Sequence, residues 1–426
     1  KAVDVTKCEK PKYDIKPVGE KEKTAPKTTI KIHTGGITML KANTGSSTLT
    51  SAYEAGKEAA KEAMTGLKAA KVAFAYASCD YDLDEMLRGI KSAAPGVPVI
   101  GNTSFTGVIT PKGFVGGEGF VGMMAIDDED MTVGVAAVKK GSDARADGAA
   151  VAKKAMQAAQ KTTPPTYFYM VAPPAEEEFF LKGISQVIGR VPFFGGSAAD
   201  NTISGQWKLY TDEAGSFADG VAVAFFWSET PMTNVFTGAY HETEDVGIIT
   251  AVKGDRTLVE IDHEPALKKY AAWRGVDPDT LMDANLLSAT IVSPLGVKDP
   301  LGDLVAIRHP MAGNADYSMN VGNKLAEGTA VIRMEASVDE LIASTGKTVE
   351  ALKNKAGAPI GAMHLVHCGG RRAGIDSRID EVAKQICDAA GDIPFLVEFT
   401  FGEYGYEDDG RNTCGGLMLS FTGFSK

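Results

Sequence analysis

Apolar positions along the chain follow a pattern that occurs three times. Residues 72–79 form an apolar run typical of a buried strand, residues 83–90 repeat apolar positions at helical spacing, and residues 97–101 begin a second strand. The same order begins again at residues 167–172 and at residues 363–367. A glycine-bearing turn and another apolar strand follow each copy. This predicts an α/β (mixed α+β) fold, in which repeated strand–loop–helix–strand units form mixed sheets with helices packed on their faces.

The pattern changes after the Glu-Thr-Pro sequence at residues 229–231. Before it, alanine-rich segments at 50–67 and 147–160 predict helices between the strands. After it, short strands occur at hairpin spacing, as at residues 246–252 and 257–261. We therefore predict two domains, at residues 29–229 and 230–426.

The first 28 residues are rich in Lys, Pro, Thr and Glu and offer little to bury, so alone they should be disordered. Two interpretations stay open: a linker without function, or a tail that docks on its own domain or on a neighbouring subunit and builds a homo-oligomer. A strand at residues 29–39 is expected to begin the fold. Because the chain starts at Lys1, it is compatible with an exported protein or with a trimmed cytoplasmic one, and the compartment stays open.

Composition excludes several classes of partner. The 426 residues are 44% hydrophobic, enough for large cores, and the net charge of −11 disfavours nucleic acid and anionic membranes. No apolar run approaches the roughly 18–20 residues that span a bilayer, so we predict no membrane-spanning segment. The five cysteines are scattered and odd in number, which does not indicate a disulfide framework.

The third copy carries the most distinctive chemistry. Its loop at residues 368–374 brings Cys368, Arg371 and Arg372 to one strand end, and Glu403 lies in a glycine-flanked turn that can approach the same edge. This mixture fits a small anionic or zwitterionic ligand. We expect Arg371 to pair with a ligand carboxylate, with Arg372 as the alternative, Glu403 to hold an ammonium group and Cys368 to pack the floor.

A second candidate is the small-residue turn that follows the strand of the second copy. Ser197, Asp200 and Asn201 there could hydrogen-bond a zwitterion, or Asp200 and Asn201 could satisfy their own backbone in a tight turn. Both interpretations stay open.

Other motifs do not indicate a cofactor or a catalytic centre. The G-x-G-x-x-G at residues 117–122 is followed by a predicted strand, whereas a dinucleotide site needs a helix there. On a strand, His364 and Cys368 share a face but lie about 13 Å apart, and His367 faces the other way, so no metal site is predicted. Neighbouring arginines favour a reactive thiol at Cys368, but a small buried residue is the preferred interpretation, and we predict no enzyme activity.

In six stretches the chain resembles the FIST (F-box and intracellular signal transduction) family, N-terminal and C-terminal domains both. The matching stretches are residues 97–101 (VPVIG), 195–200 (GGSAAD), 259–270 (VEIDHEPALKKY), 294–297 (PLGV), 368–371 (CGGR) and 400–405 (TFGEYG). The resemblance implies a sensory protein that binds small ligands such as amino acids and acts on a signalling partner. Family members are usually fused to kinase, cyclase, chemotaxis or F-box modules, and no such module is expected in this chain.

The chain departs from the family pattern at two places. The first-domain turn at residues 101–107 lacks the family's carboxylate, and Val397 followed by Glu398 stands where the family has glycine. The first departure puts a ligand site in the first domain in doubt. Some relatives are haem-binding nitric-oxide sensors, so haem is the one cofactor that the resemblance leaves open.

Overall fold

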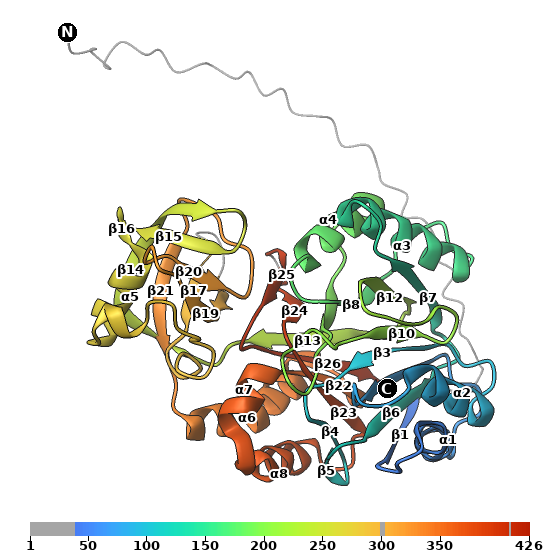
Figure 1. The fold of residues 1–426 in the computed structure, drawn as a ribbon. Coiled ribbons are helices and arrows are strands. Elements are labelled where there is room, and N and C mark those ends of the chain that lie inside the picture. The colour runs from blue at the N-terminus through green and yellow to red at the C-terminus, as the bar shows by residue number, and fades with distance from the viewer. Residues whose placement is uncertain (1–38, 299–302, 409) are drawn as a thin grey trace, which may run out of the picture. The chain divides into compact units, whose positions relative to one another are not determined.

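The structure, a computed structural model, describes residues 39–298, 303–408 and 410–426 (Figure 1). The predicted tail at residues 1–28, with its suggested role in oligomers, lies outside the described residues, as does all but the last residue of the predicted strand at 29–39. The residues that are described belong to a single unit by their contacts. Their architecture confirms the predicted mixed α/β class.

Three copies of one unit form the framework of the fold. In the first copy, β2 pairs in parallel with β3 and antiparallel with β6, and β6 pairs antiparallel with β1. The other two copies repeat these pairings, with the strand orders β7-β12-β8-β9 and β13-β26-β22-β23. The elements of the first copy are β1 (Lys41–Ser47), α1 (Ala52–Ala63), β2 (Val72–Ala77), α2 (Leu83–Ala93), β3 (Val99–Thr103) and β6 (Val121–Asp127).

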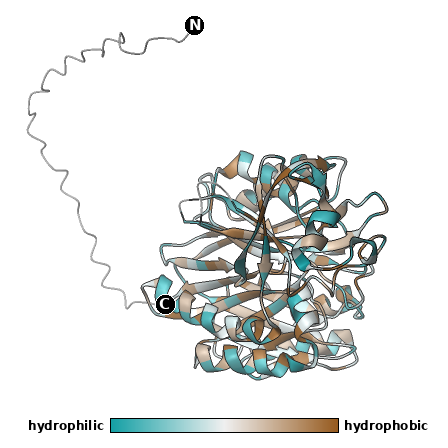
Figure 2. Cartoon of the chain, turned by 90° about the vertical axis from the view of Figure 1, so that its left-hand side faces the viewer, coloured by the Kyte–Doolittle hydropathy of each residue, from teal (hydrophilic) through white to brown (hydrophobic). Residues whose placement is uncertain are grey.

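The later copies contain the same elements in the same order. The second consists of β7 (Thr132–Lys139), α3 (Ala144–Ala158), β8 (Tyr167–Ala172), α4 (Glu177–Ile188), β9 (Phe193–Ser197) and β12 (Gly220–Trp227). The third consists of β13 (Met232–Thr237), α6 (Val338–Ala356), β22 (Ile360–Cys368), α8 (Ile379–Ala390), β23 (Phe395–Thr400) and β26 (Leu419–Ser425). In Figure 2 the sheet strands carry the most hydrophobic colours, while the helices mix hydrophobic and hydrophilic residues. This matches strands buried on both faces and helices with one exposed face.

Glycines allow the two helices of a copy to cross closely. A Cβ on Gly89 of α2 would lie 2.0 Å from the carbonyl oxygen of Tyr53 in α1, and one on Gly183 of α4 would lie 1.9 Å from that of Arg145 in α3. Both distances are far below van der Waals contact, so only glycine fits. In the third copy the corresponding contact is looser, because a Cβ on Gly346 of α6 would meet a carbonyl of α8 at 3.1 Å.

Each copy also sends a hairpin into the sheet of another copy. The hairpins are β4 (Gly107–Thr110) with β5 (Gly113–Gly116), β10 (Leu209–Thr211) with β11 (Gly215–Phe217), and β24 (Glu403–Tyr406) with β25 (Asn412–Gly415). The first joins the third copy through β23–β4, the second joins the first copy through β10–β3, and the third joins the second copy through β24–β9. The exchange is cyclic, and each sheet of six strands combines strands from two copies.

The third copy differs by a long insertion between β13 and α6. This inserted module, residues 238–337, forms a further sheet and is drawn in yellow and orange in Figure 1. Its elements are β14 (His241–Lys253), β15 (Thr257–Ile261), β16 (Glu264–Pro265), α5 (Ala266–Arg274), β17 (Leu295–Lys298), β18 (Val305–Arg308), β19 (Pro310–Gly313), β20 (Met319–Val321) and β21 (Ala330–Glu335). β14 and β15 pair antiparallel, as their hairpin spacing predicts.

Equivalent residues of the three copies meet in the core. Phe74, Tyr169 and His364 hold the same register position in β2, β8 and β22, and their ring centroids lie 4.7–5.4 Å apart. Two of these rings, Tyr169 and His364, belong to a fully buried set of polar side chains. We call this set the central polar cluster, and its members are Tyr76, Asn102, Tyr169, His364 and Glu398.

The central polar cluster holds its groups in neutral form. Asn102 Nδ2 donates to Glu398 at 2.9 Å, Tyr169 Oη donates to Asn102 Oδ1 at 3.1 Å, and Tyr76 bonds His364 Nε2. Burial raises the pKa of Glu398 to about 8 and lowers the pKa of His364 to about 3. At neutral pH their contact at 3.6 Å is therefore one between uncharged groups rather than a salt bridge.

Candidate functional site

A cavity of about 610 Å³ lies between the inserted module and the second and third copies. We call it the Cys368 cavity. Its lining includes Arg256, His309, Met311 and Asn323 from the module, Cys368, Gly370 and Leu417 from the third copy, and Pro174, Ile203 and Trp207 from the second. The size falls within the range of about 300–1,000 Å³ typical of small-molecule sites.

The walls of the Cys368 cavity are largely apolar. Trp207 and Phe401 contact each other edge to face, with ring centroids 6.1 Å apart. Ile203 is 49% exposed and Met311 is 37% exposed, although both line the cavity. Large apolar side chains this exposed mark the cavity's opening to solvent.

Cys368 forms part of the floor, at the start of a short helix rather than of the predicted loop. The chain turns directly from β22 into α7 (Gly369–Ile375), and Cys368 Sγ accepts hydrogen bonds from the N–H groups of Gly370 and Leu417, each at 3.2 Å. Burial raises the pKa of the Cys368 thiol, with the nearby Glu403 carboxyl adding to the effect. The expected lowering by neighbouring arginines is absent, because desolvation dominates. The thiol is a weak nucleophile at neutral pH.

Glu403 lies behind Cys368, in β24 rather than in a turn. It is fully buried and accepts hydrogen bonds from Thr400 Oγ1 at 2.8 Å and from the N–H of Met418 at 2.9 Å. Burial raises the pKa of Glu403 to about 8, so the carboxyl is mainly protonated near neutral pH. Glu403 contacts the Cys368 side of the floor without lining the cavity itself.

His309 contributes a neutral imidazole that the sequence did not single out. Its Nε2 donates to the carbonyl of Leu287 at 2.8 Å, and burial lowers the pKa of His309 to about 4. The residue lies between β18 and β19, in an Arg-His-Pro sequence. A polar residue before a proline at a strand end was the available signal, but nothing local connects it with Cys368.

A partly buried ion cluster fastens the inserted module to the second copy at the cavity's edge. Arg256 of the module contacts Glu178 at 2.6 Å and Glu177 at 3.1 Å, at the start of α4. Asn323 Nδ2 donates to Glu177 at 3.1 Å. Burial, with the neighbouring Glu178 charge, raises the pKa of Glu177 to about 7. The cluster ties two walls of the cavity together.

The two predicted arginines bind protein groups and do not line the cavity. Arg371 is fully buried, and its guanidinium donates to the carbonyls of Gly238 at 2.7 Å and Leu341 at 3.0 Å and to Ser344 Oγ. Arg372 lies over the Phe114 ring at 5.2 Å and donates to a main-chain carbonyl in its own loop. The structure therefore gives Arg371 a role in joining α6, α7 and the module.

The predicted turn residues also point toward protein groups. Ser197 shares a hydrogen bond of 2.7 Å with Tyr404 Oη. Asp200 accepts three N–H groups of its own loop, from Thr202, Ser204 and Gln206, and Asn201 bonds the first copy through the N–H of Thr106 and through Asp80. Of the seven predicted site residues, Cys368 alone lines this cavity, and direct ligand contact by the other six stays a prediction.

Two kinds of feature are absent from the part of the chain that the structure describes. Among residues 39–298, 303–408 and 410–426, no three or more His, Cys, Asp or Glu side chains are grouped to hold a metal ion. Nor does any helix in those ranges combine the length and apolar character needed to cross a bilayer.

Two family models match the sequence: the FIST N domain over residues 71–264 and the FIST C domain over residues 266–406. The models meet inside the inserted module, so the domain boundary predicted at residues 229/230 stays a prediction. No curated protein matches the chain.

Solved structures resemble the chain only remotely. One is the cyanuric acid hydrolase from A. caulinodans, with 11% identity, a TM-score of 0.35, and coverage of 91% of this chain and 100% of the other. Another is phosphoribosylformylglycinamidine synthase II from Thermotoga maritima, with 11% identity, a TM-score of 0.22, and coverage of 90% and 72%. Similarity at this level carries no argument about fold or activity.

Proposed function

The chain belongs to the FIST family and contains both its N and its C domain, and from this we propose that it is a non-catalytic sensory protein whose small ligand binds in the Cys368 cavity. FIST domains are small-ligand sensory domains in signal transduction. The observation that carries the proposal is the cavity itself. It has the volume and the apolar walls of a small-molecule site, and both family domains and the inserted module contribute to it.

The lining favours a ligand with a sizeable apolar part and few polar groups. Trp207, Met311 and Phe401 provide apolar contact, while His309 and Asn323 provide hydrogen-bonding groups. An amino acid with an apolar side chain, or a similar small carboxylate, meets this description.

The charges of the lining residues favour a position near the ion cluster for the polar end of such a ligand. The thiol of Cys368, the imidazole of His309 and the carboxyl behind the floor are uncharged near neutral pH, so none of them supplies a strong nucleophile or an ionic contact. Arg256 is the cation at the cavity's edge. A ligand carboxylate at this edge would share the guanidinium of Arg256 with Glu177 and Glu178. Arg371 does not line the cavity, and its guanidinium is held by carbonyl partners.

A thermal-shift screen with amino acids and small carboxylates tests the proposal. A ligand at 100 times its dissociation constant should stabilise the protein by about 2.7 kcal/mol. The blocking variant is Gly322→Val, because Gly322 lines the cavity and the atoms nearest to a Cβ there are Met311 Sδ at 3.7 Å and atoms of His309 at 4.0 Å. The matched control is Gly141→Val, at an exposed turn where a Cβ would meet only the flexible carboxylate of Asp147.

If the ligand no longer raises the melting temperature of Gly322→Val but still raises that of Gly141→Val, the result would support the cavity as the ligand site. An unchanged affinity in Gly322→Val, measured by calorimetry, would reject it. A visible absorption spectrum of the purified protein separately tests the haem alternative. A Soret band would show bound haem and would contradict the proposal of an amino-acid ligand.

A further inference from the structure

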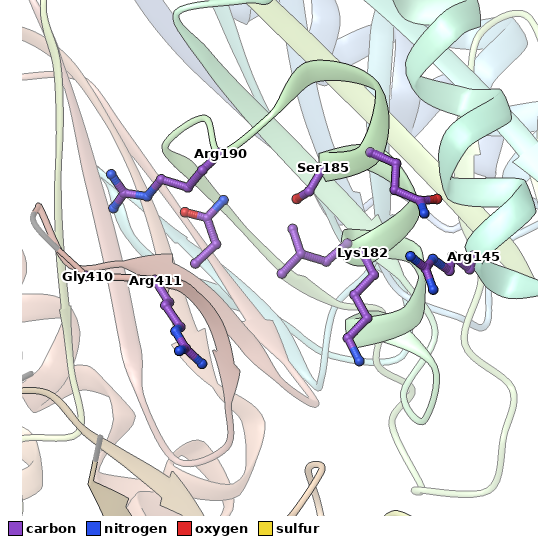
Figure 3. A pocket seen from close by; sticks show the side chains of 9 residues that line it. Arg145, Lys182, Ser185, Arg190, Gly410 and Arg411 are labelled. Carbon is purple, nitrogen blue, oxygen red and sulfur yellow. The ribbon is translucent and has the colours of Figure 1, made fainter. Parts of the chain in front are cut away.

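A second concave surface, separate from the Cys368 cavity, lies between α4 and the hairpin of β24 and β25. It is an open groove of about 570 Å³, and no residue lines both sites. Four of its lining residues are cationic: Arg145, Lys182, Arg190 and Arg411 (Figure 3). We call it the cationic groove.

The helix crossing in the second copy builds one side of the groove. The Gly183 position lets α3 approach α4 until a Cβ there would lie 1.9 Å from the Arg145 carbonyl, and this brings Arg145 next to Lys182. Lys182 and Ser185 are three residues apart on α4 and share its outer face. Both basic side chains are exposed.

The other side of the groove is fixed to the hairpin. Arg190, just after α4, donates to the main-chain carbonyls of Glu407 and Asp408, and its guanidinium lies 5.7 Å from the centre of the Tyr406 ring. Arg411 follows on the hairpin, directly before β25. The two sides of the groove therefore come from different copies of the unit, held together by the hairpin exchange.

On the α3–α4 side, Arg145 and Lys182 form no ion pair with a carboxylate of the described residues, although Lys182 lies close enough to Asp255 to help lower its pKa. Within the described ranges, neither Arg145 nor Lys182 has a carboxylate oxygen within 4.0 Å, although the whole chain carries a net charge of −11. Like charges gathered on an otherwise acidic protein raise the local potential and favour an anionic partner.

The arrangement of the cations distinguishes between kinds of anion. Figure 3 shows Arg145 and Lys182 on one side of the groove and Arg190 and Arg411 on the other, so the four heads do not converge on one point. A single phosphate group needs converging donors. In addition, β25 is the outer strand of its sheet, and an edge strand is the usual neighbour of a bound extended peptide. Arg308 of the inserted module already donates to the carbonyl of Cys414, so the Asn412 end of the strand is the part that borders the groove.

We propose that the cationic groove binds an extended acidic segment of a partner protein, with its carboxylates directed to Arg145 and Lys182. The chain's own residues 1–38 do not fit this description, because they contain nine lysines against five carboxylates. The proposal is independent of the ligand in the Cys368 cavity.

Fluorescence anisotropy tests it with a labelled ten-residue peptide of alternating Glu and Ser, and with the same peptide carrying Gln in place of Glu. The test variant is Arg145→Gln/Lys182→Gln. The control is Lys153→Gln/Lys154→Gln, which removes the same charge from exposed positions of α3 that do not line the groove. We expect the Glu peptide to bind and the Gln peptide not to bind. The test variant should bind the Glu peptide about five- to tenfold more weakly, and the control should change it less than about twofold.

Three results would overturn the proposal: no binding of the Glu peptide to the unaltered protein, equal weakening in both double variants, or complete displacement of the peptide by millimolar inorganic phosphate at constant ionic strength. The last result would assign the groove to a small phosphate anion. Thermal unfolding of each variant checks that it is folded, and Lys182→Gln alone replaces the double variant if that one is not.

Discussion

Replacing Glu398 with glutamine should change how the stability of this protein depends on pH. Burial raises the pKa of Glu398 from 4.5 to about 8, so the folded chain keeps a proton that the unfolded chain releases. The resulting stability is fully present below pH 4.5 and is lost as the pH rises to 8. Each pH unit in that window changes the free energy of unfolding by about 1.4 kcal/mol, which gives about 4 kcal/mol between pH 5 and pH 8.

Glutamine removes this dependence while keeping the shape of the side chain. It stays uncharged at every pH and can still accept the hydrogen bond from Asn102 Nδ2. The stability of Glu398→Gln relative to the unaltered protein should therefore rise by about 3–4 kcal/mol from pH 5 to pH 8. Glu177 and Glu403, whose pKa values are also raised, are present in both proteins and cancel in the difference.

Urea unfolding followed by tryptophan fluorescence at pH 5, 6, 7 and 8 measures the effect. Glu381→Gln is the matched control, because hydrogen bonding to Arg378 lowers the pKa of this exposed carboxyl and leaves it ionised throughout the range. Its difference from the unaltered protein should stay constant. If Glu398→Gln also kept a constant difference across these four pH values, the account of a neutral, buried carboxyl in the central polar cluster would be wrong.

Three further predictions follow from contacts already described. Gly183→Ala should lower the free energy of unfolding by about 1–3 kcal/mol in urea titrations because its Cβ overlaps a backbone carbonyl, while Gly346→Ala should cost less. Cys368 should react with iodoacetamide far more slowly in the native protein than in urea, since burial raises its thiol pKa, and rapid native labelling would restore the thiol-enzyme interpretation. Arg256→Met removes the cation that contacts Glu177 and Glu178, and the buried Glu177 carboxyl then takes a proton, so the variant should destabilise the fold by about 1–3 kcal/mol, and adding Glu177→Gln should recover part of that loss.

The repeated framework was predictable because the same order of local sequence patterns occurs in each copy. A buried strand, a helix and a proline-led strand follow one another at Pro98, Pro192 and Pro394, and β-pairing within a copy needs only neighbouring segments. The exchange of hairpins was not predictable. The pairing of Val397 with Ile109 joins segments nearly three hundred residues apart, and neither segment carries a local signal for it.

The predicted site and the Cys368 cavity share Cys368, and ligand contact there stays a prediction. The sequence singled out Cys368 because its loop combines a thiol with two arginines at one strand end. Arg371 was assigned to a ligand because the sequence shows a cation but not the carbonyl groups of Gly238 and Leu341 that hold it. His309 and Arg256 were missed because the inserted module reaches the cavity only through the tertiary fold.

The cyclic exchange of hairpins sets the smallest piece of this chain that is able to fold. One copy expressed alone would present two unsatisfied sheet edges and a hairpin with no sheet to join, so excised fragments should aggregate or associate. Three separate chains, each encoding one copy, would restore every hairpin pairing between copies by closing a ring. Joining them in one polypeptide makes assembly independent of protein concentration. It also allows the copies to differ, as the third copy does through its inserted module.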